Sequence, residues 1–144
     1  MLIIFNKFTF VFGLCTLIIL GCSQGNQEQS KKEATIRHLS KSIEYDKKAT
    51  AIINKGNAYS VMDTNDSEEM IKLLRKALEE AKQVDFGILN SEVPGWGAKF
   101  RDGYIEGLSL ILKGHETANM QLTIEGQKKA ADYKEWFNRE KRKN

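Results

Sequence analysis

The sequence predicts an all-α protein, a four-helix up-down bundle made of two helical hairpins. Three observations lead to this fold class. Apolar side chains recur at three- and four-residue steps over most of the second half of the chain. The single proline argues against a β-sandwich, which needs many turns. No cysteine follows Cys22, so the domain must be stabilised by hydrophobic packing without disulfides, as a well-patterned helical bundle can be.

The composition fits one globular domain of an ordinary kind. The chain has 144 residues, of which 41% are hydrophobic and 28% charged. Its net charge of +3 is small. A nucleic-acid binder would be expected to present a strongly basic face, so we expect no nucleic-acid partner.

The first 20 residues are almost wholly apolar, and Lys7 is their only charged side chain. A secretory signal peptide and an uncleaved anchor helix both fit this pattern. The first needs a positive charge, an apolar stretch of about 7–15 residues and a small-residue cleavage site. The second needs about 20 apolar residues. Under either interpretation, the rest of the chain lies at a membrane.

The four residues Ile19-Leu20-Gly21-Cys22 favour the signal peptide. They resemble the lipobox of bacterial lipoproteins, although Leu20 departs from it because smaller residues are commoner at that position. The resemblance covers only the first 22 residues. It implies that residues 1–21 are removed, that Cys22 receives a diacylglycerol group, and that its new amine is often acylated, for example with palmitate. It also implies a lipid-anchored protein at the bacterial cell membrane or outer membrane, with its domain outside the cytoplasm.

The chain therefore divides into a signal peptide (1–21), a lipidated cysteine with a flexible tether (22–30) and a helical domain (31–144). The tether is predicted because residues 23–30 are polar and carry no large apolar group that could be buried.

The first hairpin is predicted from about Gln29 to Val84. Its first helix carries a weak apolar stripe to about Met62, and residues 63–65 form a turn. Asp66, with Glu69 three residues later, is the predicted N-cap of the second helix. The apolar face of that helix consists of Met70, Leu73, Leu74, Ala77, Leu78, Ala81 and Val84.

The second hairpin is predicted from the apolar spacing after residue 99. Its first helix carries Phe100, Tyr104, Leu108, Ile111 and Leu112 on one face, and Gly114 is expected to end it. Its second helix is expected to begin near Thr117. Gly126 and Ala130 lie on the apolar face of that helix and are small enough to allow a neighbouring helix to come close.

A pair of helical repeats is the alternative to the bundle. Residues 55–59 (KGNAY) followed by 76–81 (KALEEA) faintly resemble a tetratricopeptide unit, with the spacing disturbed by an insertion.

Asp85–Ala98 is the only long loop predicted, and long loops are often functional. Within it, Trp96, Pro94 and Phe86 are the candidate partner-binding residues, because tryptophan is favoured at binding hot spots. The alternative, which we favour, is that Phe86 and Trp96 fold back with Ile88 and Leu89 to plug the open end of the bundle.

No residue pattern predicts a catalytic, metal or cofactor site. His38 and His115 each stand alone, and the chain lacks both a zinc-protease motif and a CxxCH haem site. The carboxylates Asp102 and Glu106 lie four residues apart, as surface pairs often do. The basic C-terminal run after Asn138 suits the negative end of a helix dipole or an anionic surface.

We therefore expect a membrane-tethered, non-enzymatic, protein-binding or accessory module of the bacterial envelope, with no cofactor and an unidentified protein partner. The alternatives are a small-ligand or haem-binding helical bundle, with Met62, Met70 or Met120 as a haem ligand beside a histidine, and an enzyme of unrecognised type.

Overall fold

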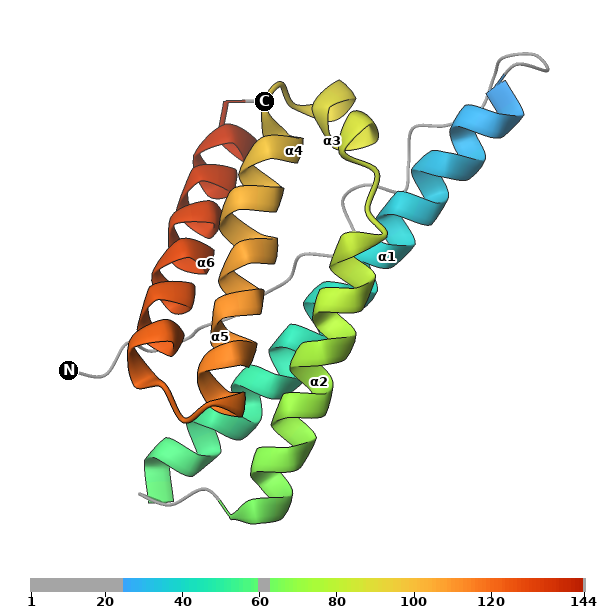
Figure 1. Cartoon of the computed structure of the whole chain (residues 1–144). Helices are drawn as coiled ribbons and strands as arrows, with labels where there is room; N and C mark the ends of the chain where they lie inside the picture. The colour runs from blue at the N-terminus through green and yellow to red at the C-terminus, as the bar shows by residue number, and fades with distance from the viewer. Residues whose placement is uncertain (1–24, 60–62, 144) are drawn as a thin grey trace.

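The computed structural model describes residues 25–59 and 63–143, and within these ranges the chain is almost wholly helical and contains no strand (Figure 1). This confirms the all-α class. In chain order the elements are α1 (Gly25–Tyr59), α2 (Thr64–Lys82), α3 (Phe86–Glu92), α4 (Trp96–Lys99), the π-helix η1 (Phe100–Ile105), α5 (Glu106–Glu116) and α6 (Met120–Lys141). They outnumber the four predicted helices because the predicted loop contains α3 and most of α4, and the third predicted helix is divided into η1 and α5.

Helix α1 begins earlier than predicted. Residues 25–30, predicted to belong to a flexible tether, already form its first turns. Their glutamines and Glu28 have good helix propensity, and an acidic residue in the first turn suits the helix dipole. The predicted signal peptide and Cys22 lie outside the described residues.

Helices α1 and α2 form the antiparallel hairpin that the sequence predicted (Figure 1). The N-cap of α2 is Asp63 instead of the predicted Asp66: the Asp63 side chain accepts a hydrogen bond of 2.7 Å from the Asp66 backbone N–H. The predicted apolar face of α2 is buried. Met70, Ala77 and Ala81 are 0% exposed, which places this helix at the centre of the core.

The chain then turns through α3 into a second helical rod. The Asp85 side chain caps α3 by accepting hydrogen bonds from the backbone N–H groups of Gly87 and Ile88. The predicted long loop is thus mostly helical. Gly95, with a φ of 81°, makes the left-handed turn that leads into α4. Helices α4, η1 and α5 follow one another directly, and the wide π-turn lies between the two α-helical parts.

Helices α5 and α6 form the second hairpin and approach closely through glycines. A Cβ on Gly126 would lie 2.5 Å from the Gly107 carbonyl oxygen, so the two backbones meet at this point. Gly114 does not end the helix as predicted, since α5 continues to Glu116. Its lack of a side chain admits Thr123 of α6 instead: a Cβ there would lie 2.2 Å from the Thr123 hydroxyl oxygen.

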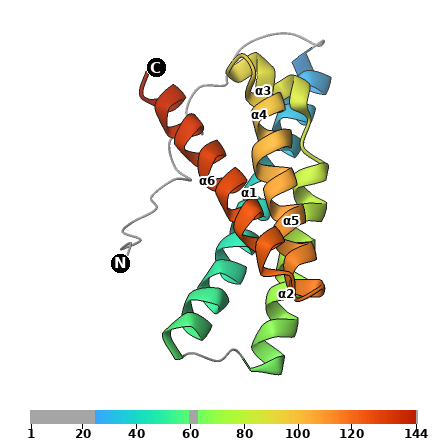
Figure 2. The same cartoon turned by 60° about the vertical axis from the view of Figure 1, so that its left-hand side comes forward.

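Helix α6 begins at Met120, slightly later than predicted, because Asn119 is its N-cap and accepts hydrogen bonds from the next backbone N–H groups. Helices α2 and α5 join the two hairpins, and η1 packs against α6 and α2. Figure 2 shows α6 crossing α1 obliquely, so the ends of these two helices diverge on either side of the crossing.

The core lies between α2, η1 and α5. Its largest fully buried side chains are Phe100, Met70, Leu74, Leu108 and Ser42. Among the residues described, no helix combines the length and the apolar character needed to cross a membrane.

Candidate functional site

A buried polar cluster lies where α1 meets the second hairpin. Ser42 of α1 is 0% exposed, and its hydroxyl donates a hydrogen bond of 2.7 Å to the Ala77 carbonyl oxygen of α2. The same hydroxyl oxygen lies 3.2 Å from the Tyr104 hydroxyl oxygen of η1. Ser42 therefore links three helices inside the core. A buried hydroxyl needs such partners, because an unpaired one costs about 1–3 kcal/mol.

Asp46 lies one turn after Ser42 on α1 and is the acidic member of this cluster. Burial raises its pKa from 3.8 to about 6, against the lowering effects of a hydrogen bond from Tyr104 and of the charges on Lys134 and Lys47. Burial also raises the pKa of the Tyr104 phenol well above its ordinary value of 10. Tyr104 thus stays a neutral hydroxyl that donates to Asp46. Because Lys134 belongs to α6, Asp46 connects α1 electrostatically to two elements of the second hairpin.

Aromatic side chains surround this cluster, and Tyr133 of α6 lies at their centre. Its ring centroid is 5.7 Å from that of Tyr104 and 5.8 Å from that of Phe100. Phe100 and Tyr104 both come from η1 and stack with centroids 5.1 Å apart. π-Helical turns occur frequently at functional sites. Here the π-turn supplies Phe100 and Tyr104. We call the place where these two side chains meet Ser42 and Asp46 of α1 and Tyr133 of α6 the joint between the hairpins.

The structure places Trp96, one of the predicted partner-binding residues, inside this aromatic group. Its indole N–H donates a hydrogen bond of 2.9 Å to the Tyr133 hydroxyl, and its ring lies 4.9 Å from that of Phe137. Phe86 is half-buried, 6.3 Å from Phe100 in an edge-on arrangement. These contacts match the alternative in which both residues plug the end of the bundle. Pro94 is exposed in the turn before α4.

The two histidines lie in different places. His38 Nδ1 is 2.6 Å from Glu80 Oε2, and this contact lowers the pKa of Glu80. His115 lies at the end of α5, where burial lowers its pKa and leaves its Nε2 atom without a hydrogen-bond partner. No group of three metal-ligating side chains occurs in residues 25–59 and 63–143.

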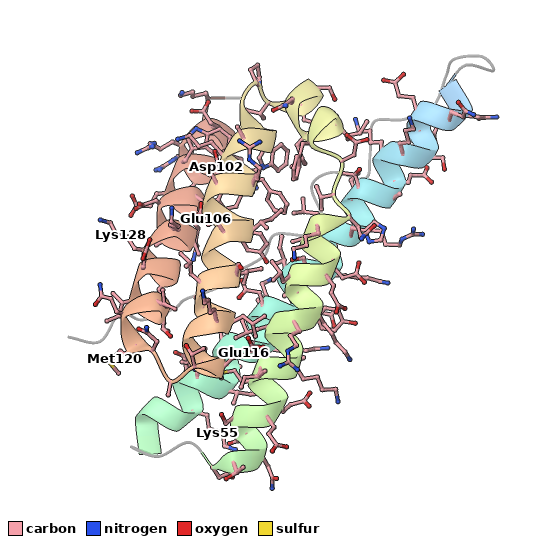
Figure 3. The ribbon with its side chains drawn as sticks, viewed as in Figure 1. Lys55, Asp102, Glu106, Glu116, Met120 and Lys128 are labelled. Carbon is pink, nitrogen blue, oxygen red and sulfur yellow. The ribbon has the colours of Figure 1, made fainter. Side chains whose placement is uncertain are left out.

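Asp102 and Glu106, labelled in Figure 3, each pair with a basic residue. Asp102 Oδ1 is 2.7 Å from Arg101 Nε, and Glu106 Oε2 is 3.3 Å from Lys129 Nζ of α6. The structure thus engages this carboxylate pair in surface ion pairs.

Of the methionines considered as haem ligands, Met70 is 0% exposed in the core, whereas Met120 is 76% exposed. Met62 lies outside the described residues. Met120 and Ile124, which is 51% exposed, stand one turn apart at the start of α6. Figure 3 shows Met120 on the outer side of that helix. Among the described residues, these two are the large apolar side chains that stand exposed.

Sequence reasoning did not identify the Ser42–Asp46–Tyr104 cluster. A signal for it was available, because Ser42 and Asp46 interrupt the apolar stripe of α1 at helical spacing, between Leu39, Ile43 and Ala49. Polar residues in such a stripe must find buried partners.

Comparison with known proteins adds no relative. The chain matches no protein-family model, and neither a curated protein nor a solved structure is significantly similar to it. Residues 25–59 and 63–143 thus form two helical hairpins that meet through polar and aromatic side chains.

Proposed function

We propose that this protein is a lipid-anchored, non-enzymatic module that binds another protein at the bacterial envelope. The observation that carries the anchoring is the lipobox-like segment ending in Cys22, three residues before the first residue of α1. A cysteine modified with two or more acyl chains would hold the domain durably at a membrane, since each buried CH₂ contributes about 0.8 kcal/mol.

The contacts of the chemistry-bearing side chains support a binding role over a catalytic one. Within the joint between the hairpins, Tyr104 is hydrogen-bonded to both Ser42 and Asp46. The Trp96 indole N–H is likewise hydrogen-bonded to the Tyr133 hydroxyl. Their geometry serves to fix the orientation of the two hairpins, and a rigid shape is what a binding module must present.

The exposed apolar pair on α6 supports a protein as the ligand. Met120 and Ile124 would gain by being removed from water, and methionine adapts well to partner surfaces. Apolar side chains exposed in adjacent turns are typical of contacts with other proteins when they form a continuous patch.

A site-specific photo-crosslinker tests this proposal. We would place it at Met120, at Ile124 and, as a matched control, at the neighbouring exposed Glu125, in cells that express the full chain with its own signal. The proposal predicts one discrete crosslinked protein from positions 120 and 124 and a much weaker product from position 125. It also predicts loss of that product in a Cys22→Ser variant. Equal products at all three positions, or none, would contradict it.

A further inference from the structure

Charges of opposite sign gather at the two ends of the long axis of the molecule. Residues 139–143 at the end of α6 contain four basic side chains and one acidic one. Residues 63–69 at the start of α2 contain four acidic side chains and no basic one. The basic side chains Arg139, Lys141, Arg142 and Lys143 are all exposed. The end of α6 therefore carries an excess of basic side chains and the start of α2 an excess of acidic ones, although Glu140 pairs with Lys143 at the first and Lys55 of α1 with Asp66 at the second.

The basic end is also the end at which the chain enters the domain. Figures 1 and 2 both place the C-terminal end of α6 at the same end of the molecule as the first turn of α1, with α3 beside them, and the start of α2 at the opposite end. Because a turn about the vertical axis leaves heights unchanged, both views show the same order of these helix ends from top to bottom.

The segment between the lipid attachment and the domain is short. Only Ser23 and Gln24 separate Cys22 from Gly25, the first residue of α1. Three residue steps span at most about 10 Å in a fully extended chain. A lipid on Cys22 would therefore keep the first turn of α1 within about that distance of the membrane surface. The ion pair between Lys32 of α1 and Glu92 of α3 ties this part of α1 to the rest of the same end.

We propose that the end formed by residues 139–143 and the first turns of α1 docks onto anionic phospholipid headgroups, and that the acidic end of α2 points away from the membrane. This inference rests on the proposed lipid anchor. The lipid anchor holds the first turn of α1 at the membrane surface. The basic side chains at the end of α6 are attracted to the negative headgroups and bring that helix end to the surface as well. Each lysine or arginine near an anionic surface strengthens such attraction about fivefold.

Helix dipoles offer a competing explanation for the same charges. Basic residues suit the C-terminal end of α6, and acidic residues suit the N-terminal end of α2, with no membrane involved. The two explanations differ in what neutralisation of the basic end should change. Dipole compensation predicts lower stability and unaltered orientation at a membrane, whereas docking predicts altered orientation.

The test uses the lipidated protein reconstituted in vesicles, with a polarity-sensitive dye on a cysteine introduced by Lys143→Cys or, as the matched control, by Glu68→Cys. Both positions are exposed and lie at opposite ends. Flotation with the vesicles is measured first, beside a Cys22→Ser variant, and reports the anchor alone. Dye accessibility to the neutral quencher acrylamide is then measured in phosphatidylcholine vesicles with and without phosphatidylglycerol.

Docking predicts that the dye at position 143 is protected several-fold relative to position 68 in phosphatidylglycerol vesicles. The protection should disappear in pure phosphatidylcholine or in high salt. In the Arg139→Gln, Arg142→Gln double variant most of the several-fold protection of position 143 should be lost. Equal quenching at the two positions in floated protein would overturn the docking proposal while leaving the anchor intact. Failure to float, equal to that of Cys22→Ser, would overturn the anchor itself.

Discussion

The carboxyl group of Asp46 offers the sharpest test of the joint between the hairpins. Its pKa is raised by burial to about 6 in the folded protein, compared with an ordinary value of 3.8. The folded state therefore holds the Asp46 proton more tightly than the unfolded state does. Stability contributed by this proton is fully present below about pH 4 and is lost as the pH rises towards 6, beyond which the loss is constant.

The magnitude follows from the two pKa values. Since one pKa unit corresponds to 1.36 kcal/mol, the difference between 3.8 and about 6 corresponds to a loss of about 3 kcal/mol at neutral pH. The substitution Asp46→Asn keeps the size of the side chain and an oxygen that accepts from Tyr104, but it removes the buried charge. We expect the variant to gain up to about 3 kcal/mol over the wild type at pH 7–8, or roughly 10 °C in Tm, and little at pH 4.

Urea unfolding followed by circular dichroism from pH 3.5 to pH 8 measures this gap directly. The gap should open between pH 4 and pH 6 and then stay level. Tyr104→Phe is the informative companion, because it removes the hydrogen bond that lowers the pKa of Asp46 in the folded protein. In that background the gap should still open near pH 4, but it should level off at a higher pH and be larger. A gap that is independent of pH, or a variant less stable at pH 8 than at pH 4 relative to the wild type, would refute the buried-carboxylate reasoning.

Three further predictions concern packing and polar contacts. Gly126→Ala should lower the free energy of unfolding by about 1–3 kcal/mol, because the new Cβ would meet the backbone of α5. A higher melting temperature, as expected for alanine at an open helical site, would contradict the close approach of α5 and α6. Trp96→Phe should cost about 1 kcal/mol by removing the hydrogen bond to Tyr133, whereas Pro94→Ala should change the melting temperature little; equal effects would show that the indole N–H contributes nothing. Glu80→Gln should reduce stability by up to about 1 kcal/mol at neutral pH and by little at pH 3. The pKa of Glu80 is lowered in the folded protein, so the stability that its carboxylate contributes is lost as the pH falls and the carboxylate becomes protonated. Urea unfolding curves at the two pH values check this.

The sequence predicted the helical class and both hairpins because helical periodicity is a local property of the chain. The apolar face of α2 is buried almost residue for residue, as its spacing indicated. Element ends were less predictable. Asp63 and Asp66 both suit an N-cap, and only the backbone geometry selects Asp63.

Properties that depend on tertiary contacts were harder to predict. Gly114 resembles a helix terminator, yet it serves as a gap for Thr123 of α6, and only the approach of α6 decides between these roles. Gly126 was predicted correctly as a point of close approach because it lies on the apolar face of its helix. The Ser42–Asp46–Tyr104 cluster brings together residues about 60 positions apart in the sequence, and no local pattern could pair them.

The lipid anchor at Cys22 is the premise of both proposals, and intact-mass measurement of the membrane fraction can establish or exclude it. The full chain, expressed with its own signal in a bacterial host, is compared with a Cys22→Ser variant. We expect a wild-type mass that lacks residues 1–21 and carries acyl groups, and a variant without acyl groups. An unprocessed mass in both samples would show that the first segment is an uncleaved anchor helix and would contradict the lipoprotein assignment.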